Sequence, residues 1–162
     1  MLVEMKVAGL AIDPLTNMPI LLLKDHKMQR TVPIWIGLVE ASAIATELQQ
    51  LKLERPMTHD LVHNLLGALG VETLHVEIND LRDNTYFATL VVRQGTRVLE
   101  MDARPSDAIA IAMRSGCSIL VDDRVVEKAA CFDLRDETPL ESDAAGDLLA
   151  GLPDSYFGKW KM

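Results

Sequence analysis

Three short hydrophobic runs, each bounded by polar turn residues, occupy the start of the chain. Runs of this length that are rich in aliphatic and β-branched residues predict β-strands. They cover Val3–Ile12, Pro19–Leu23 and Thr31–Ile36, and the first run ends at the turn-forming cluster Asp13–Asn17. Gly37 then breaks the pattern, so we predict three strands ahead of the first helix.

Apolar residues then recur at every third or fourth position, which is the period of an α-helix. This pattern covers Leu38–Leu53. A second helix is predicted over Thr58–Leu69, with Thr58 as its N-cap and Gly70 as its stop. Asp60 lies in the first turn of that helix, where a negative charge is favourable.

The second half of the chain repeats this order of elements. We predict strands at Leu74–Ile78, Tyr86–Val92 and Val98–Ala103, a helix from Pro105 or Ser106 to Gly116, a strand at Ser118–Val121, and a last helix capped by Asp122-Asp123 and ending near Ala130. A shift by 67 positions aligns the two halves without a gap and places Glu40–Ala45 on Asp107–Ala112. We therefore interpret the chain as two repeats, at about residues 3–69 and 70–130.

Composition places both repeats in one globular domain, residues 1–132, followed by an acidic C-terminal tail at 133–162. The 162 residues can bury one core, and 49% of them are hydrophobic while only 4% are aromatic. Aliphatic residues must therefore fill the core, and we interpret the alanines between positions 108 and 112 as a packing surface. We expect the tail to be partly ordered, with its aromatic residues docked on another surface.

The formal net charge of −8 argues against a protein that coats nucleic acid, since such binding depends on Lys and Arg. This net charge is compatible with an enzyme that binds one or two phosphates at a local site. Cys117 and Cys131 are too few for a disulfide scaffold. No apolar run reaches the ~20 residues that span a bilayer. We therefore expect a cytoplasmic protein without membrane contact.

Two segments combine an Arg-Pro pair with a hydroxyl group and an acid at the predicted start of a helix. They are Arg55-Pro56-Met57-Thr58-His59-Asp60 and Arg104-Pro105-Ser106-Asp107. Helix N-termini attract anions, and the guanidinium group is well shaped to grip phosphate. These segments are therefore the best candidates for a functional site.

Together with the segment Val32–Gly37 and the following Glu40, these segments resemble the bifunctional nuclease domain family. The matching stretches are Val32–Gly37, Arg55–Leu61 and Asp102–Ala108, and the resemblance extends over about residues 2–130. The resemblance implies an α+β fold in which two βββαα repeats form a single curved, barrel-like mixed sheet with the helices packed outside. It also implies nuclease activity on RNA and DNA.

Residues of these segments could together cleave a phosphodiester bond, which requires an activated nucleophile and stabilised phosphoryl oxygens. Arg55, Arg104 and Ser106 would bind phosphate. His59 would act as general acid or base, because imidazole groups titrate near neutral pH. The acids would complete the catalytic set and are also candidate ligands for Mg²⁺ or Mn²⁺: Glu40, Asp60, Asp102 and Asp107.

Each of these residues also has a structural explanation. The acids could complement helix N-termini or cap a strand end. The two Arg side chains could form internal salt bridges with those acids. His59 and His63 share one helix face, but the lack of an evident third ligand argues against a zinc site.

Three functions are open at this point: a metal-assisted nuclease, a non-catalytic domain that binds an anion, nucleic acid or regulatory partner, and a structural module. The environment of Arg55 and Arg104 separates the last two. Guanidinium groups that face an open cleft indicate a binding role. Guanidinium groups fully paired with acids in a closed pocket indicate a structural role. We also expect a homo-oligomer, with a dimer favoured because isologous dimers are the commonest assemblies.

Overall fold

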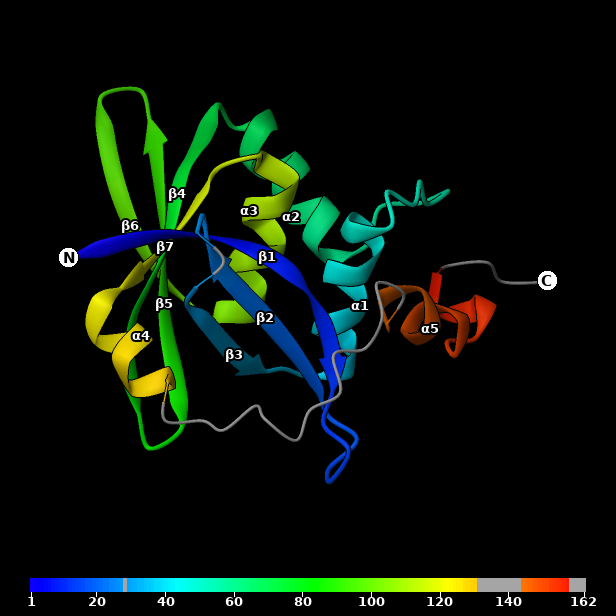
Figure 1. The fold of residues 1–162 in the computed structure, drawn as a ribbon. Helices are drawn as coiled ribbons and strands as arrows, with labels where there is room; N and C mark the ends of the chain where they lie inside the picture. Colours follow the sequence, from blue (N-terminus) through cyan, green and yellow to red (C-terminus); the bar gives the residue numbers. More distant parts are fainter. Residues whose placement is uncertain (28, 131–143, 158–162) are drawn as a thin grey trace.

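The computed structural model describes residues 1–27, 29–130 and 144–157 (Figure 1). Within these ranges the chain forms one seven-stranded sheet and five α-helices, so the α+β class is confirmed. The strands are β1 (Leu2–Ile12), β2 (Pro19–Asp25), β3 (Thr31–Trp35), β4 (Val71–Arg82), β5 (Thr85–Gln94), β6 (Arg97–Ala103) and β7 (Ser118–Asp122). The helices are α1 (Leu38–Leu48), α2 (Thr58–Ala68), α3 (Pro105–Ser115), α4 (Asp123–Ala129) and α5 (Ala144–Ala150), followed by a 3₁₀ helix, Asp154–Phe157. None of the helices in these ranges is both long and apolar enough to cross a membrane.

The sheet is mixed and open. Its strand order is β3-β2-β1-β7-β4-β5-β6, with β4 and β7 parallel and the other neighbours antiparallel. Strands β3 and β6 lie at the two edges of this order, so the barrel implied by the family resemblance is not closed. The hydroxyl group of Tyr86 on β5 nevertheless donates a 2.7 Å hydrogen bond to the carbonyl oxygen of Pro33, which brings β3 against the other half of the sheet. The internal duplication stays a prediction.

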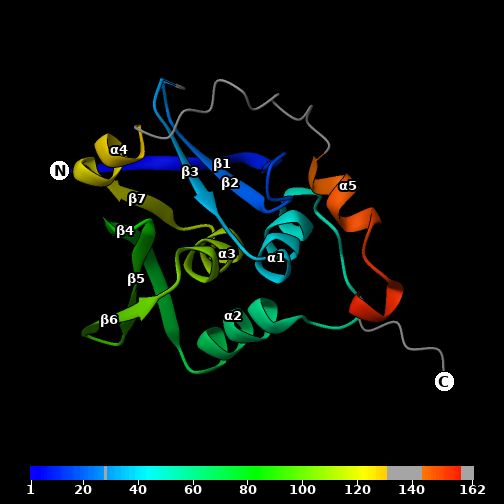
Figure 2. The same cartoon turned by 90° about the horizontal axis from the view of Figure 1, so that it is seen from below.

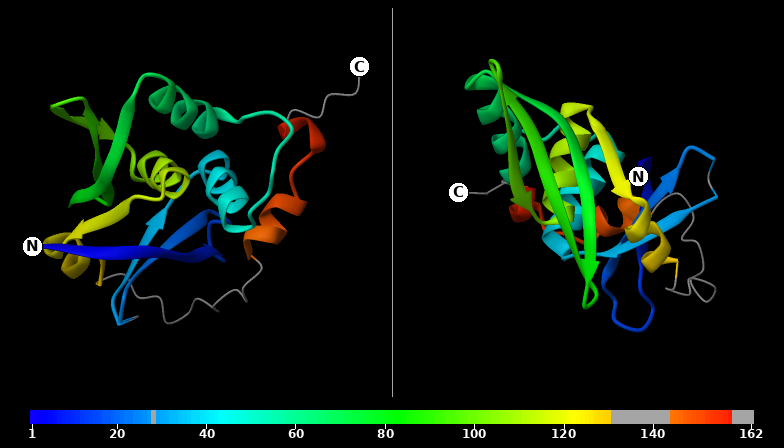
Figure 3. Two further views of the ribbon diagram at one scale, coloured as in Figure 1. Left: turned by 90° about the horizontal axis from the view of Figure 1, so that it is seen from above. Right: turned by 90° about the vertical axis from the view of Figure 1, so that its left-hand side faces the viewer.

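Helices α1 and α3 lie between the two halves of the sheet, and not on its outside as we expected (Figures 2 and 3). Residues 41–46 of α1 and 108–112 of α3 are all buried. The physical reason is the small size of their alanines, which lets neighbouring elements approach a helix from several sides. The packing role predicted for the alanines at 108–112 is therefore confirmed.

Two helix boundaries differ from the sequence-based prediction. Helix α1 ends at Leu48 and not at Leu53, because Gln50 adopts a left-handed conformation with φ of 50°. Helix α2 has Met57 and not Thr58 as its N-cap, since the Met57 N–H donates to Oδ2 of Asp60 over 2.8 Å and completes the capping interaction one residue earlier.

Part of the C-terminal tail packs on the domain. Helix α5 contacts α1 and β1, and the hydroxyl group of Tyr156 shares a 2.7 Å hydrogen bond with that of Ser42 on α1. The docking of Tyr156 agrees with the expectation for the tail aromatics, whereas Trp160 and the segment 131–143 lie outside the described residues. The division at residue 132 stays a prediction.

Candidate functional site

The first turns of α1, α2 and α3 each carry an acid at the third helical residue. These acids are Glu40, Asp60 and Asp107. An acid at this position is favoured because it faces unpaired backbone N–H groups and the positive end of the helix dipole. The structural explanation given above therefore holds for all three, but each acid also has a partner on another helix.

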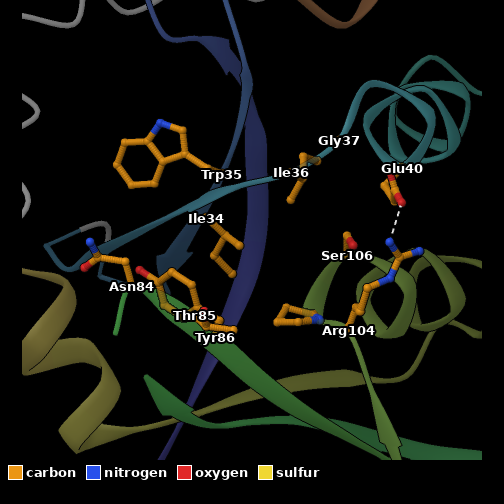
Figure 4. Close-up of a pocket in the computed structure, with 11 residues that line it drawn as sticks. Ile34, Trp35, Ile36, Gly37, Glu40, Asn84, Thr85, Tyr86, Arg104 and Ser106 are labelled. Atoms are coloured by element: carbon orange, nitrogen blue, oxygen red, sulfur yellow. Dashed lines mark ion pairs between the residues drawn. The ribbon is translucent and has the colours of Figure 1, made fainter. Parts of the chain in front are cut away.

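Arg104 joins α1 to α3 through two ion pairs (Figure 4). Its Nη1 atom lies 2.7 Å from Oε1 of Glu40, and its Nε atom donates to Oδ2 of Asp107 over 2.7 Å. The other carboxylate oxygen of Asp107 lies 2.8 Å from Nε2 of His59 on α2. We call Glu40, Arg104, Asp107 and His59 the ion-pair chain.

Gly37 makes room for the Glu40 end of the ion-pair chain. A Cβ atom at position 37 would lie 2.3 Å from Oε2 of Glu40, which is closer than such atoms can approach. The φ angle of Gly37 is −72°, which any residue can adopt, so a larger residue here would be opposed only by the need to move the Glu40 carboxylate. The glycine that ends the segment Val32–Gly37 is therefore part of the site.

Charge compensation keeps Asp107 ionised. Burial raises the pKa of its carboxyl group, but the hydrogen bonds from Arg104 and His59 outweigh burial, and the pKa lies below its ordinary value. In return, Asp107 and Glu40 raise the pKa of Arg104. At neutral pH Asp107 is therefore an acceptor, and Nε2 of His59 donates to it.

Two pockets flank the ion-pair chain and share Glu40 and Arg104. The β3 pocket, of about 560 Å³, lies between β3, the β4–β5 turn and the first turn of α3 (Figure 4). The tail pocket, of about 390 Å³, contains His59 and Asp107 and is lined in part by the 3₁₀ helix of the tail. The side chain of Arg104 is 67% exposed, so its guanidinium group faces open pockets.

Arg114, in the last turn of α3, has a structural role that the sequence analysis did not predict. Its side chain is 4% exposed, and its Nε atom donates to Oδ1 of Asp60 over 2.6 Å. Its Nη1 and Nη2 atoms donate to the carbonyl oxygens of Ala110 and Ala43 over 3.0 and 3.1 Å. Arg114 and Asp60 thereby tie α1, α2 and α3 together beneath the ion-pair chain.

The stability of the fold is expected to fall in acid, because Asp60 must then lose its charge. Burial raises the pKa of Asp60, but the hydrogen bonds from Arg114 and from the Met57 N–H outweigh it, and the pKa is lowered. A lowered folded-state pKa gives stabilisation that is present above the unfolded-state value of about 3.9 and is lost as pH falls through the folded-state value.

Urea unfolding at a series of pH values, from neutral pH to below the folded-state pKa of Asp60, measures this loss of stability. The Asp60→Asn variant should show a weaker dependence on pH than the wild type. An identical pH profile in the two proteins would show that Asp60 does not carry the dependence.

Arg55 and Asp102 lie apart from the ion-pair chain. Arg55 is exposed on the loop before α2, and Asp102 is exposed on β6 opposite Thr89. Neither forms an ion pair with the residues that the structure describes, and neither lines the β3 pocket or the tail pocket. The two Arg-Pro segments therefore do not form a single phosphate clamp.

The remaining candidates are Ser106 and the two histidines of α2. Ser106 is buried in the first turn of α3 and lines the β3 pocket. His59 faces Asp107, whereas Nδ1 of His63 lies 3.2 Å from the hydroxyl oxygen of Ser115. The two histidines thus have separate partners on α3.

The candidate carboxylates do not fit a divalent cation in this arrangement. Both oxygens of Asp60 and both of Asp107 have hydrogen-bond donors, and Glu40 is paired with Arg104. In residues 1–27, 29–130 and 144–157, no group of three or more His, Cys, Asp or Glu side chains is placed to hold a metal ion. Mg²⁺ and Mn²⁺ prefer carboxylate oxygens that are free to coordinate them.

Comparison with known proteins agrees with the resemblance found in the sequence. The family model described as the bifunctional nuclease domain matches residues 21–133, which is more than half of the chain. The chain is also similar to proteins from two strains of Mycobacterium tuberculosis, each named only as an uncharacterized protein. It is 40% identical to each over 142 residues, which cover 88% of this chain and 84% of the relative. The matched region includes the whole ion-pair chain, and this protein belongs to the bifunctional nuclease domain family.

Proposed function

We propose that this protein is a nuclease that hydrolyses phosphodiester bonds of RNA, DNA or both at the ion-pair chain. The observation that carries the proposal is the exposed guanidinium group of Arg104, which two carboxylates hold between two open pockets. An arginine fixed in this way is oriented in advance to grip phosphate. Membership of the family suggests a nuclease-related function and so supports the same conclusion.

Arg104 keeps donors available for a substrate phosphate. Its Nε and Nη1 atoms form the ion pairs, while Nη2 has no partner among the residues that the structure describes. The N-terminus of α3 adds backbone N–H groups and the positive end of a helix dipole. Arg104 would therefore bind the phosphate and stabilise the negative charge that develops on its oxygens during the reaction.

His59 supplies the proton transfer in this proposal. Because ionised Asp107 accepts from Nε2, the neutral imidazole keeps an unprotonated Nδ1 atom. In the tail pocket this atom can take a proton from an attacking water molecule or ribose hydroxyl group. The attacking oxygen bonds to phosphorus while the P–O bond to the leaving oxygen breaks, and the protonated imidazole or a solvent water then protonates that leaving oxygen. Asp107 is a positioning residue that holds the imidazole in the required tautomer, as the carboxylate does in hydrolytic triads.

The other candidate residues have supporting roles or none. Glu40 holds Arg104 in place, and Asp60 is assigned to the architecture through Arg114. Arg55 and Asp102 have no role in the step. No step is assigned to a divalent cation, because its candidate ligands at the ion-pair chain are already paired.

A non-catalytic binding domain is the second candidate, and the charges of the site favour it. Glu40 and Asp107 carry two negative charges against the one positive charge of Arg104. This balance weakens the attraction for a polyanion, as does the formal net charge of −8. The same pockets would then bind a ligand or a regulatory partner without cleaving it, and the predicted homo-oligomer is compatible with either candidate.

Cleavage assays on single- and double-stranded RNA and DNA test the nuclease proposal. Arg104→Ala should lower the rate about 10²- to 10³-fold, which is the usual loss when one charge-stabilising donor is removed. Arg124→Ala is the matched control, because Arg124 is exposed, pairs with Asp122 and lines neither pocket. It should cleave at the wild-type rate.

Two outcomes would overturn the proposal. Equal cleavage by the wild type and both folded variants would indicate a contaminating nuclease or another site. If the wild type cleaves nothing in Mg²⁺, Mn²⁺ or EDTA, the protein is a binding domain.

A further inference from the structure

We infer that the β3 pocket is a nucleotide subsite, which holds the phosphate of one nucleotide at α3 and its base against β3. The inference rests on the proposed nuclease function and names the part of the substrate that this pocket takes. Its volume of about 560 Å³ lies within the range of about 300–1,000 Å³ found for small-ligand sites.

The hydroxyl group of Ser106 gives this pocket a polar group that is open to a ligand. Ser106 is 6% exposed, and its hydroxyl group forms no hydrogen bond with the residues that the structure describes. Figure 4 shows this side chain directed into the pocket beside Arg104. No buried side-chain polar atom of the described residues lacks a hydrogen-bond partner, so this unpaired hydroxyl group is accessible from the pocket. A ligand oxygen can accept a hydrogen bond from it there.

The end of the pocket next to Ser106 fits a phosphate group. The first backbone hydrogen bond of α3 runs from the Ala108 N–H to the carbonyl oxygen of Arg104, over 3.0 Å. The N–H groups of Ser106 and Asp107 therefore have no partner within the helix. The Ser106 N–H and hydroxyl groups, together with the guanidinium group of Arg104 that also lines the pocket, provide neutral and charged donors of the kind that bind phosphate. The ion pair with Arg104 reduces the repulsion from Glu40 at this end.

The opposite wall fits the planar ring of a base. Trp35 and Tyr86 both line it, and aromatic rings stack on bases of any sequence. Trp35 is 36% exposed, and its Nε1 atom donates to Oδ2 of Asp13 over 3.1 Å, which restricts the orientation of the ring. Burial raises the pKa of Tyr86, so its hydroxyl group stays protonated and donates to Pro33. Both rings are thus held in place before a ligand binds.

Asn84 and Thr85 add polar groups on the same wall as Trp35 (Figure 4). Asn84 has a φ angle of 59° in the turn between β4 and β5, a left-handed conformation that Asn tolerates. Its amide group offers a donor and an acceptor, which is the combination that the edge of a base can pair with. Phosphate donors at one end and rings with an amide at the other together match a nucleotide.

Fluorescence of Trp35 tests the subsite directly. The chain has two tryptophans, so the Trp160→Phe variant makes Trp35 the single reporter. The probes are adenosine 3′- and 5′-monophosphate, adenosine and inorganic phosphate. We expect at least one nucleotide to change the Trp35 emission and to bind at least tenfold more tightly than inorganic phosphate. If no nucleotide changes the emission, or none binds more tightly than inorganic phosphate, the inference is wrong.

Two variants in this background locate the ligand within the pocket. Ser106→Ala should weaken nucleotide binding about tenfold, as expected for the loss of one hydrogen bond to a charged group. Ser118→Ala is its control, because Ser118 is exposed and bonds to Glu4. Asn84→Gly should weaken binding of the nucleotide but not of inorganic phosphate, and glycine suits the φ angle at this position. Asp83→Gly is its control, because Asp83 has a similar φ angle of 48° in the same turn but does not line the pocket.

These outcomes separate the subsite from the nuclease proposal. Cleavage that depends on Arg104, with nucleotide binding unchanged in both Ser106→Ala and Asn84→Gly, would overturn the subsite and leave the nuclease standing. Nucleotide binding that both variants weaken, in a protein that cleaves no nucleic acid, would support the subsite and overturn the nuclease.

Discussion

Arg114→Ala is expected to lower the free energy of unfolding by about 3–5 kcal/mol, the usual cost of breaking a buried ion pair. The substitution leaves Oδ1 of Asp60 without its guanidinium partner and removes the donors to the carbonyl oxygens of Ala110 and Ala43. All three acceptors lie where α1, α2 and α3 meet. Because a domain of this size is stable by only about 5–15 kcal/mol, urea unfolding followed by circular dichroism will detect the loss easily.

Two further variants show whether the ion pair itself is responsible. Arg124→Ala breaks an exposed pair with Asp122 and should change the stability by about 1 kcal/mol or less. The double variant Asp60→Asn/Arg114→Met removes both charges, so it should be less destabilised than Arg114→Ala alone. If Arg114→Ala lowers the free energy of unfolding no more than Arg124→Ala does, the structural role assigned to Arg114 is wrong.

Local sequence patterns predicted most element boundaries to within a few residues, and the largest difference is at the end of α1. Helix α4 begins at the predicted cap, since the Asp122 side chain accepts from the Arg124 N–H. Helix α1 ends early although Leu51 continues its apolar stripe, and Leu51 is exposed. A periodic pattern shows which positions could join a helix, whereas the exit from α1 is set by the path the chain must take to α2.

The arrangement of the elements depended on contacts between distant parts of the chain. Strand β7 was predicted, but its place between β1 and β4 depends on pairing of residues 2–5 with 119–122. The alanines of α3 indicated close packing without showing that neighbours would surround the helix. Contacts over such separations leave no periodic trace in the sequence.

The two Arg-Pro segments predicted part of the site and also misled. Both helices carry the acid at the third helical residue, as the shared pattern implies. Arg104 is itself the N-cap of α3, whereas Arg55 lies two residues before the N-cap Met57. This offset places the two guanidinium groups differently, so Arg104 reaches the acids and Arg55 does not.

Arg114 was missed although the sequence held a signal for it. It lies seven residues after Asp107, which puts both side chains on the same face of α3. A charge on that face must find a partner once the helix is enclosed. The partner, Asp60, comes from another helix, and only the packing of α2 against α3 brings the two together.

His59→Ala is expected to lower the cleavage rate about 10²- to 10⁴-fold, the range for loss of a general acid or base. His63→Ala is the matched control, because His63 lies on the same helix and contacts Ser115 on α3, away from the tail pocket. The control should keep a rate close to that of the wild type. Both variants need unfolding curves, so that a loss of activity is not confused with a loss of structure.

A test with added imidazole distinguishes proton transfer from a structural role of His59. His59→Ala leaves a gap in the tail pocket next to Asp107, where a free imidazole can enter and donate the same hydrogen bond to Asp107. It should restore part of the activity of His59→Ala and none of the activity of Arg104→Ala, because a missing phosphate grip cannot be replaced by a base. If His59→Ala and His63→Ala lose activity equally, or imidazole has no effect on a folded His59→Ala protein, the assignment of His59 as the base is wrong.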